Sequence, residues 1–206
     1  MQAICHCYLL LRKYPMSVSQ TYKLICEVAL KSFRDSSKIR AHQLWQHSPA
    51  LIMVVRRPGC KLCRREAKDL AEHRTQITEK WGIPMYAVVH EELGVEEFNK
   101  EFFQGTIYFD ENKGFYKALG GGKLSWANWT SLLNPTTLYS YFTSGVDGNL
   151  KGEGRIYGGL YILGKGDKGV IYEYREKYLG DIAPMEEVLK ICEQVATETE
   201  IPDAKL

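Results

Sequence analysis

Residues 50–81, ALIMVVRRPGCKLCRREAKDLAEHRTQITEKW, carry the strongest structural signal in this chain. Their first six residues are apolar and rich in strand formers, which is typical of a short strand in the centre of a sheet. Pro58 and Gly59 then predict a tight turn. From Cys60 to Trp81, apolar residues recur among charged ones at the spacing of an amphipathic helix. The stretch therefore predicts a buried strand, a turn and a long helix with a cysteine pair at its start.

The two cysteines, Cys60 and Cys63, have the spacing C-x-x-C. A thiol in the first turn of a helix ionises more easily, because unpaired N–H groups and the positive end of the helix dipole face it. Cys63 lies one turn deeper, on the apolar face of the predicted helix. We therefore interpret Cys60 as the nucleophile and Cys63 as its sheltered partner in a dithiol redox pair.

A C-x-x-C pair is also compatible with two structural thiols or with half of a zinc site. Structural zinc takes four ligands, and the sequence holds no second C-x-x-C. Cys5, His6 and Cys7 could complete such a site only if the N-terminal tail folded back. Redox chemistry is the preferred interpretation, and we expect no bound metal.

Basic residues cluster around the pair: Arg56, Arg57, Lys61, Arg64, Arg65 and Lys68. Nearby cations lower the pKa of a thiol, so they could stabilise the Cys60 thiolate. They could also attract a carboxylate-bearing lipid or a peroxide. We select Arg57, Lys61 and Arg64 as candidate helpers. The alternative is a solvated basic surface that neighbouring acidic residues partly balance.

Length and composition limit the remaining possibilities. A chain of 206 residues fits one domain with a substantial core. The formal net charge of +2 gives no reason to expect nucleic acid as a partner. No apolar run approaches the ~20 residues that a transmembrane helix needs, and we expect no such segment. Six cysteines are too sparse for a disulfide scaffold, so we expect a reducing, cytoplasmic location.

The rest of the chain predicts alternating strands and helices: strands at 85–89 and 106–109, helices at 94–103 and 115–119, an aromatic helical insertion at 123–145, a hairpin of strands 159–163 and 170–174, and a last helix at 184–196. The β-α-β units predict parallel strands with right-handed crossovers, and the hairpin adds antiparallel ones. A C-x-x-C after the first such strand is the thioredoxin-like arrangement. We therefore predict an α/β thioredoxin-like fold, with a central mixed sheet flanked by helices.

We divide the chain into a helical or poorly ordered lead at 1–37, a thioredoxin-like domain at 38–197 and a flexible tail at 198–206. The lead predicts one helix that ends near 34–37, with Ser37 as the cap of a next short helix. The aromatic insertion, with Trp126 and Trp129, either packs over the sheet or forms the wall of an apolar pocket beside the cysteines. Packing is the preferred interpretation.

Several separated motifs, in order, resemble the peroxiredoxin-like 2 proteins: RRPGCKLCRREA at 56–67, YFD at 108–110, GNLKGEG at 148–154, GGLYILG at 158–164 and YREK at 174–177. The resemblance covers roughly residues 38–192 and is closest to the A branch of that family. It implies a thioredoxin fold, a redox-active C-x-x-C and an antioxidant role in cellular redox control.

Two positions depart from related folds. A cis-proline faces the C-x-x-C in the familiar thioredoxin fold, where this chain has Gly158 and Gly159. Peroxiredoxins proper carry a hydroxyl residue in the loop before their reactive cysteine, which this loop lacks. We expect Pro58, Gly59, Gly158 and Gly159 to line the substrate pocket.

The predicted function is a thiol-dependent redox-regulatory, antioxidant protein that reduces peroxides or disulfides. No bound cofactor is needed, and electrons would come from thioredoxin or glutathione, ultimately from NADPH. One alternative is reduction of a lipid endoperoxide, as in the related prostamide/prostaglandin F synthase branch. Another is a non-catalytic interaction protein whose disulfide switches partner binding.

Overall fold

The computed structural model describes residues 18–128, 130 and 134–200, and within them the strands form a seven-stranded mixed sheet of order β2-β1-β5-β4-β3-β6-β7. The strands are β1 (Ala29–Ser32), β2 (Lys38–Arg40), β3 (Ala50–Val54), β4 (Met85–Val89), β5 (Thr106–Phe109), β6 (Gly159–Leu163) and β7 (Val170–Arg175). Strand β3 pairs in parallel with β4 and antiparallel with β6, and β4 pairs in parallel with β5. This arrangement confirms the predicted fold class.

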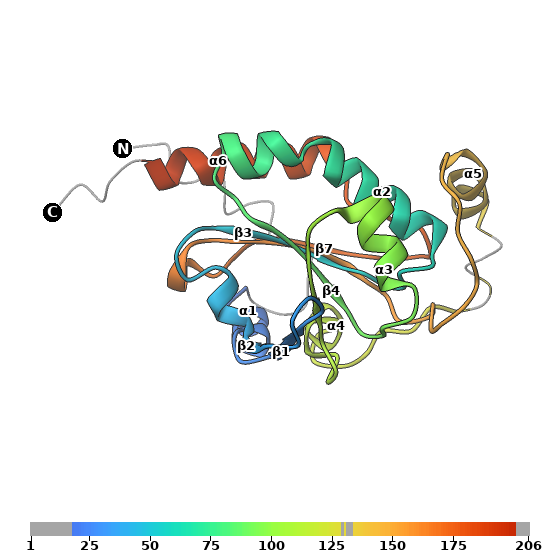
Figure 1. The fold of residues 1–206 in the computed structure, drawn as a ribbon, viewed down its shortest axis with the longest axis horizontal. Coiled ribbons are helices and arrows are strands. Elements are labelled where there is room, and N and C mark those ends of the chain that lie inside the picture. Colours follow the sequence, from blue (N-terminus) through green and yellow to red (C-terminus); the bar gives the residue numbers. More distant parts are fainter. Residues whose placement is uncertain (1–17, 129, 131–133, 201–206) are drawn as a thin grey trace, which may run out of the picture.

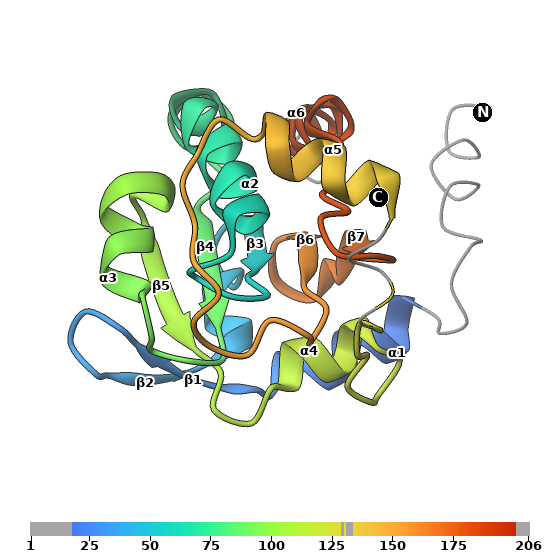
Figure 2. The same ribbon diagram turned by 90° about the vertical axis from the view of Figure 1, so that its right-hand side faces the viewer.

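Helices cover both faces of the sheet (Figures 1 and 2). They are α1 (Val18–Cys26), α2 (Lys61–Glu72), α3 (Val95–Phe98), α4 (Gly114–Leu119), α5 (Pro135–Thr143) and α6 (Met185–Glu200). Helices α2, α3 and α6 lie on one face, and α1 and α4 lie on the other. Short π-helical turns follow α2 at Thr75–Lys80 and α3 at Asn99–Phe103, and 3-10 turns lie at Ala41–Leu44 and Gly166–Lys168.

The position of β3 explains its apolar sequence. Alternate side chains of a strand point to opposite faces, so Leu51 and Met53 enter the core under α2, while Ile52 and Val54 enter the core over α4. Both faces are covered, and every residue of the strand is buried. A strand buried on both sides must be apolar at consecutive positions, which is the pattern that predicted it.

The predicted strands at 85–89 and 106–109 and the late hairpin are confirmed, since β6 and β7 pair antiparallel. The last helix begins at Met185 and continues to Glu200, into the segment predicted as a flexible tail. No helix in the described part of the chain is long and apolar enough to cross a membrane.

The N-terminal lead differs from the prediction. The expected helix ends at Cys26, and Ala29–Ser32 forms a strand that pairs antiparallel with β2 and β5. The predicted boundary between 37 and 38 therefore falls inside a hairpin of the same sheet. Ser37 does not cap a helix; its hydroxyl donates to Asp35 in the hairpin turn at 2.7 Å. Residues 1–17, with Cys5 and Cys7, lie outside the described residues.

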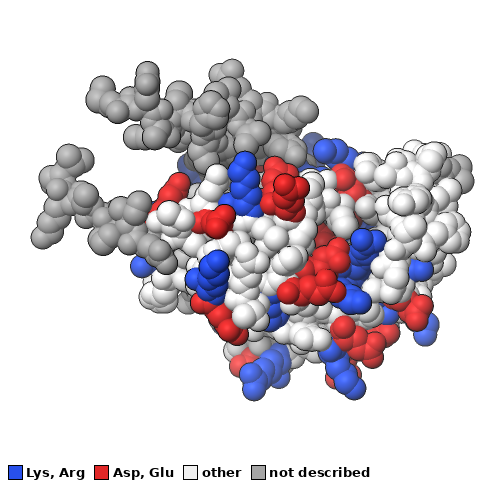
Figure 3. Space-filling view, turned by 90° about the horizontal axis from the view of Figure 1, so that it is seen from above, with Lys and Arg blue, Asp and Glu red and all other residues white. Residues whose placement is uncertain are grey.

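The aromatic insertion also differs from the prediction. Helix α5 begins at a proline, with the side chain of Asn134 accepting a hydrogen bond from the Thr136 N–H at 2.9 Å. Two of its aromatic side chains are exposed and not packed over the sheet, since Tyr139 is 71% exposed and Phe142 is 77% exposed, while Thr137 is buried. Figure 3 shows that the end of the molecule where α5 lies is largely uncharged. Trp126 is half-exposed, and Trp129 lies outside the described residues.

Candidate active site

The cysteine pair lies where β3 ends and α2 begins. Cys60 is the N-cap of α2, with extended backbone angles (φ −73°, ψ 124°), and its carbonyl accepts a hydrogen bond from the Arg64 N–H at 2.9 Å. Cys63 lies on the buried face of the first turn. Both are free thiols. The structure therefore places Cys60 at the helix N-terminus, as the sequence predicted.

Arg56 is the cation that contacts the thiol. Its Nη2 donates to Cys60 Sγ at 2.9 Å, and both side chains are buried. A hydrogen bond from the Cys63 thiol, the charge of Arg56 and the N–H groups at the helix start hold the pKa of Cys60 well below its usual range, although burial opposes them. These interactions favour the thiolate form of Cys60.

Cys63 takes the opposite protonation state. Its hydrogen bond to Cys60, its burial and the charge on Cys60 raise the pKa of Cys63 well above the usual range. Two thiols in contact cannot both ionise easily, because the second anion would lie beside the first in a low dielectric. In the reduced pair, ionisation is therefore favoured at Cys60 and opposed at Cys63.

The three predicted helper residues have other partners. Arg57 donates to the carbonyl oxygens of Lys151 and Asn149 at 3.2 and 2.6 Å. Arg64 donates to Asp147 O at 3.2 Å and forms an ion pair with Glu97 at 2.6 Å. Lys61 Nζ lies 4.9 Å from the centroid of the Tyr141 ring. The structure thus corrects the prediction: the cation on the thiol is Arg56, one residue earlier in the chain.

A loop formed by residues 147–154, the covering loop, closes over the cysteines. It runs from α5 past the start of α2 toward β6 (Figure 2), and the Asn149 N–H donates to Gly59 O at 2.8 Å. At Gly148 a Cβ atom would lie 2.7 Å from the backbone nitrogen of Lys61, so only glycine allows this approach. Cys60 is consequently only 5% exposed and Cys63 only 3%.

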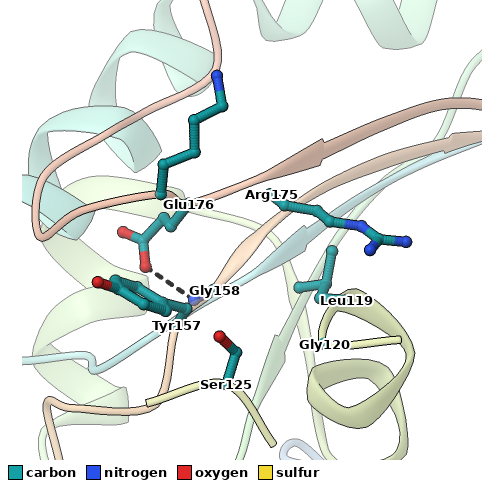
Figure 4. A pocket seen from close by; sticks show the side chains of 8 residues that line it. Leu119, Gly120, Ser125, Tyr157, Gly158, Arg175 and Glu176 are labelled. Carbon is teal, nitrogen blue, oxygen red and sulfur yellow. Dashed lines mark hydrogen bonds between the residues drawn. The ribbon is translucent and has the colours of Figure 1, made fainter. Parts of the chain in front are cut away.

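A cavity of about 280 Å³ lies at the start of β6 and the end of β7 (Figure 4). It is lined by Leu119, Gly120, Ser125, Tyr157, Gly158, Arg175, Glu176 and Lys177. Of the four predicted pocket residues, Gly158 lines this cavity. Gly59 lies beneath the covering loop, where a Cβ atom would meet the side chain of Asn149, and a Cβ at Gly159 would meet Tyr174 O.

Glu176 connects this cavity to the thiolate. One of its carboxylate oxygens accepts a hydrogen bond from the Gly158 N–H at 2.7 Å (Figure 4), and the carboxylate lies 3.4 Å from Arg56 Nε. Arg56 therefore bridges a buried carboxylate and a buried thiolate. Sequence reasoning assigned no role to Glu176, although it lies in the YREK motif at 174–177.

Two further side chains support the backbone that leads into the motif. Tyr116 OH donates to Val55 O at 2.7 Å and to Val88 O at 3.1 Å. His90 Nε2 lies 2.9 Å from Arg56 O. Both side chains are buried, and they hold the chain between β3 and Cys60 in place.

The zinc alternative needs further ligands close to Cys60 and Cys63, and its candidates Cys5, His6 and Cys7 lie outside the described residues. In the described ranges, no three His, Cys, Asp or Glu side chains lie close enough together to hold a metal ion. The Cys60 thiol contacts Arg56, and the two thiols contact each other.

Glu66, one turn after Cys63 on α2, makes the stability pH-dependent. Burial, and then the charge of Glu176, raises the pKa of this carboxyl to about 8 from 4.5. Between these values the folded protein binds the proton more tightly than the unfolded chain, so the free energy of unfolding falls as pH rises. Glutamine does not ionise, so we expect the free energy of unfolding of Glu66→Gln to fall by a few kcal/mol less than that of the parent between about pH 4.5 and pH 8. Urea unfolding at a series of pH values in this range measures the difference.

Glu97→Gln is the matched control for this prediction. A hydrogen bond from Arg64 lowers the pKa of Glu97, so its contribution has the opposite sign: it is present at higher pH and is lost as pH falls. Glu97→Gln should therefore weaken the protein at neutral pH. If the free energy of unfolding of Glu66→Gln fell with rising pH as steeply as that of the parent, the prediction would be contradicted.

Comparison with known proteins gives matches over most of the chain. The family described as AhpC/TSA antioxidant enzyme matches residues 69–178. Peroxiredoxin-like 2A of Xenopus tropicalis is 38% identical over 177 residues, which are 82% of this chain and 74% of that protein. Peroxiredoxin-like 2A of Homo sapiens is 35% identical over 178 residues, 84% of this chain and 76% of that protein.

Among solved structures, peroxiredoxin Q of Xanthomonas campestris aligns with a TM-score of 0.58 at 12% identity, covering 84% of this chain and 94% of that one. At this identity the likeness concerns the fold alone, and it agrees with the predicted thioredoxin-like architecture. The family match at 69–178 begins after Cys60 and Cys63, so the assignment of the cysteines depends on the geometry described above.

Proposed function

This chain belongs to the peroxiredoxin-like 2A family, as its motifs predicted, and on this basis we propose that it reduces peroxides or disulfides through Cys60 and Cys63. Family and fold together support a redox function of the antioxidant type. The observation that carries the proposal is the hydrogen bond of 2.9 Å between Arg56 Nη2 and Cys60 Sγ, beside the thiol of Cys63. A buried guanidinium on a sulfur at a helix N-terminus favours the thiolate, which is the nucleophile.

The proposed cycle has two chemical steps. The Cys60 thiolate attacks a peroxide oxygen, the O–O bond breaks, and the products are a sulfenic acid at Cys60 and an alcohol. The Cys63 thiol then attacks that sulfur, which forms the Cys60–Cys63 disulfide and releases water. With a disulfide substrate, Cys63 instead resolves a mixed disulfide at Cys60.

An external dithiol must then restore the pair. We propose thioredoxin or glutathione, reduced ultimately by NADPH, with no cofactor bound to this chain. The four cysteines in the described ranges, Cys26, Cys60, Cys63 and Cys192, are free thiols. We propose a reducing compartment such as the cytoplasm, because six cysteines in 206 residues are too sparse for a disulfide scaffold.

An apolar peroxide, such as a lipid endoperoxide, is a second candidate substrate for the same pair. A cavity of about 220 Å³ between α2 and α5 is lined by the apolar side chains of Leu62, Tyr139 and Ile182, by Arg65, Ser140 and Thr143, and by Gly180. An apolar chain can lie against the first three, while the Arg65 guanidinium can hold a carboxylate. Comparing a lipid endoperoxide with a small alkyl hydroperoxide under the same reducing system distinguishes the two substrates.

The test of the function is steady-state turnover with NADPH, thioredoxin reductase, thioredoxin and an alkyl hydroperoxide. We expect Cys60→Ser to abolish NADPH consumption. Cys63→Ser should react with one equivalent of peroxide and then stop, because the sulfenic acid has no resolving thiol. Full activity in Cys60→Ser would refute the assignment.

The same assay separates an enzyme from a redox-responsive interaction protein. An enzyme consumes many equivalents of NADPH per protein, whereas a switch is oxidised once and then stays oxidised. If the unmodified protein consumed only one equivalent of NADPH, both in the assay with thioredoxin and in a separate assay with glutathione, the result would favour the interaction protein.

A further inference from the structure

Peroxide reduction needs a proton that the cysteine pair does not supply in its first step. When the Cys60 thiolate attacks the peroxide, the leaving alkoxide must gain a proton as the O–O bond breaks. Cys60 has already lost its own proton, and Cys63 needs its thiol for the second step. A general acid must therefore lie close to the sulfur.

Glu176 is the carboxyl group joined to the thiolate by a shared partner. Its side chain is 6% exposed and lies 3.4 Å from Arg56 Nε, while Nη2 of the same guanidinium lies 2.9 Å from Cys60 Sγ. The guanidinium is planar and rigid, so it fixes the carboxyl and the sulfur relative to each other. Their separation is set by the width of a single guanidinium group.

We propose that Glu176 is the general acid of this site and gives its proton to the oxygen that leaves when Cys60 attacks a peroxide. This inference rests on the peroxide reductase function proposed above and adds a catalytic residue to it. In the step, thiolate, peroxide and carboxylic acid become sulfenic acid, alcohol and carboxylate. The S–O bond forms as the O–O bond breaks, sulfur is oxidised by two electrons, and charge and protons balance.

The surroundings of Glu176 suit this role. Burial, with a smaller contribution from the charge on Cys60, raises the pKa of its carboxyl to about 6, although Arg56 and the hydrogen bond from the Gly158 N–H oppose the rise. The charge of Glu176 also contributes to raising the pKa of three neighbouring groups, Cys63 and Glu66 of α2 and Tyr116 of α4. A carboxyl tuned toward neutrality is the most effective acid near neutral pH.

The cavity provides the route by which Glu176 regains its proton. Glu176 lines this cavity together with Ser125 and Tyr157 (Figure 4), whereas neither Cys60 nor Arg56 is part of the lining. The carboxyl therefore lies between the open space and the thiolate. A proton can enter from the cavity while the covering loop keeps the cysteines closed.

Other titratable groups near the site are committed elsewhere. Tyr116 OH donates to two backbone carbonyls, and His90 Nε2 lies against Arg56 O. Glu66 accepts a hydrogen bond from the Ala183 N–H, whereas Glu176 is the carboxyl that forms an ion pair with Arg56, the partner of Cys60. Glu176 is therefore the group whose position and acidity fit proton delivery.

The test compares two reactions of Cys60 in the full chain. An alkyl hydroperoxide has a leaving oxygen that needs a proton, whereas iodoacetamide releases iodide, which needs none. We expect Glu176→Gln to slow the reaction with the hydroperoxide by about 100-fold. The reaction with iodoacetamide should keep its rate, because glutamine retains an acceptor for the Gly158 N–H.

Glu173→Gln is the matched control, because Glu173 is a second buried glutamate on β7 that pairs with an arginine, Arg175. It should change neither rate. A peroxy acid is the matched substrate, since its leaving carboxylate needs no proton, and Glu176→Gln should reduce it at the parent rate.

Two outcomes overturn the inference: equal loss in both reactions, which would make Glu176 only a support for Arg56, or no loss in either. Failure of the proposed function is distinct, because the unmodified protein would then react with iodoacetamide but not with any peroxide.

Discussion

Replacing Arg56 by glutamine is expected to raise the pKa of Cys60, because the charge of this close cation favours the thiolate. At a pH below the pKa of Cys60, each unit by which that pKa rises lowers the thiolate fraction about tenfold, and the alkylation rate falls with it. The contact that is lost is the hydrogen bond of 2.9 Å from Nη2 to Cys60 Sγ. The measurement is the rate of Cys60 alkylation by iodoacetamide as a function of pH.

Arg57→Gln is the control that separates the two adjacent arginines. Arg57 donates to the carbonyl oxygens of the covering loop and not to the thiol. Its replacement should loosen the loop, so Cys60 becomes more accessible while the midpoint of its pH profile stays in place. A shift of the midpoint in Arg57→Gln, with none in Arg56→Gln, would contradict the arrangement of the site.

Loss of Arg56 also leaves Glu176 buried without its partner, which is strongly destabilising when it is not relieved. The double variant Arg56→Gln/Glu176→Gln removes both charges, and the glutamate change keeps the size of that side chain. We expect it to recover much of the lost stability while the raised pKa of Cys60 persists. Recovery of a low pKa in the double variant would show that Arg56 acts only through the fold.

Gly158→Ala is expected to lower the free energy of unfolding by about 1–3 kcal/mol, the usual cost of overpacking a tight site. A Cβ atom here would lie 2.3 Å from Val54 O and 3.0 Å from the backbone nitrogen of Arg56. Both contacts are with backbone at the end of β3, which cannot move without displacing the thiol partner. Urea unfolding measures the loss, and the alkylation rate of Cys60 should fall with it.

Gly59→Ala is the control, because it also creates a contact of 2.3 Å, but with the end of the Asn149 side chain. A flexible side chain can move aside, so the loss of stability should be smaller than at Gly158. If both variants lost the same free energy of unfolding, the backbone at Val54 would be able to move aside as easily as the Asn149 side chain, and the prediction would be wrong.

The central elements could be predicted because their signals are local. An apolar run buried on both faces identified β3, and helical spacing identified the start and face of α2. The same reasoning identified the hairpin of β6 and β7. It failed for Ala29–Ser32, which pairs with β2 in a hairpin and with β5 from a distant part of the chain. Local pattern cannot show such a partner.

The choice among the basic residues was a matter of tertiary structure. Arg56 and Arg57 are neighbours in the sequence and look equivalent beside the cysteines. The covering loop accepts hydrogen bonds from Arg56, Arg57 and Arg64 through its carbonyl oxygens. Arg56 also donates to Cys60 Sγ and lies against Glu176 at the end of β7. The loop carbonyls and Glu176 each lie more than eighty residues along the chain from the arginine that they contact.

By itself, the sequence determined the position of the thiols at the start of a helix after a buried strand, since propensity and periodicity act over a few residues. Only the tertiary structure decided which cation ionises Cys60, which carboxyl faces it and how closely the pair is covered. Those properties depend on distances of a few ångströms between segments far apart in the chain, and packing of the sheet sets those distances.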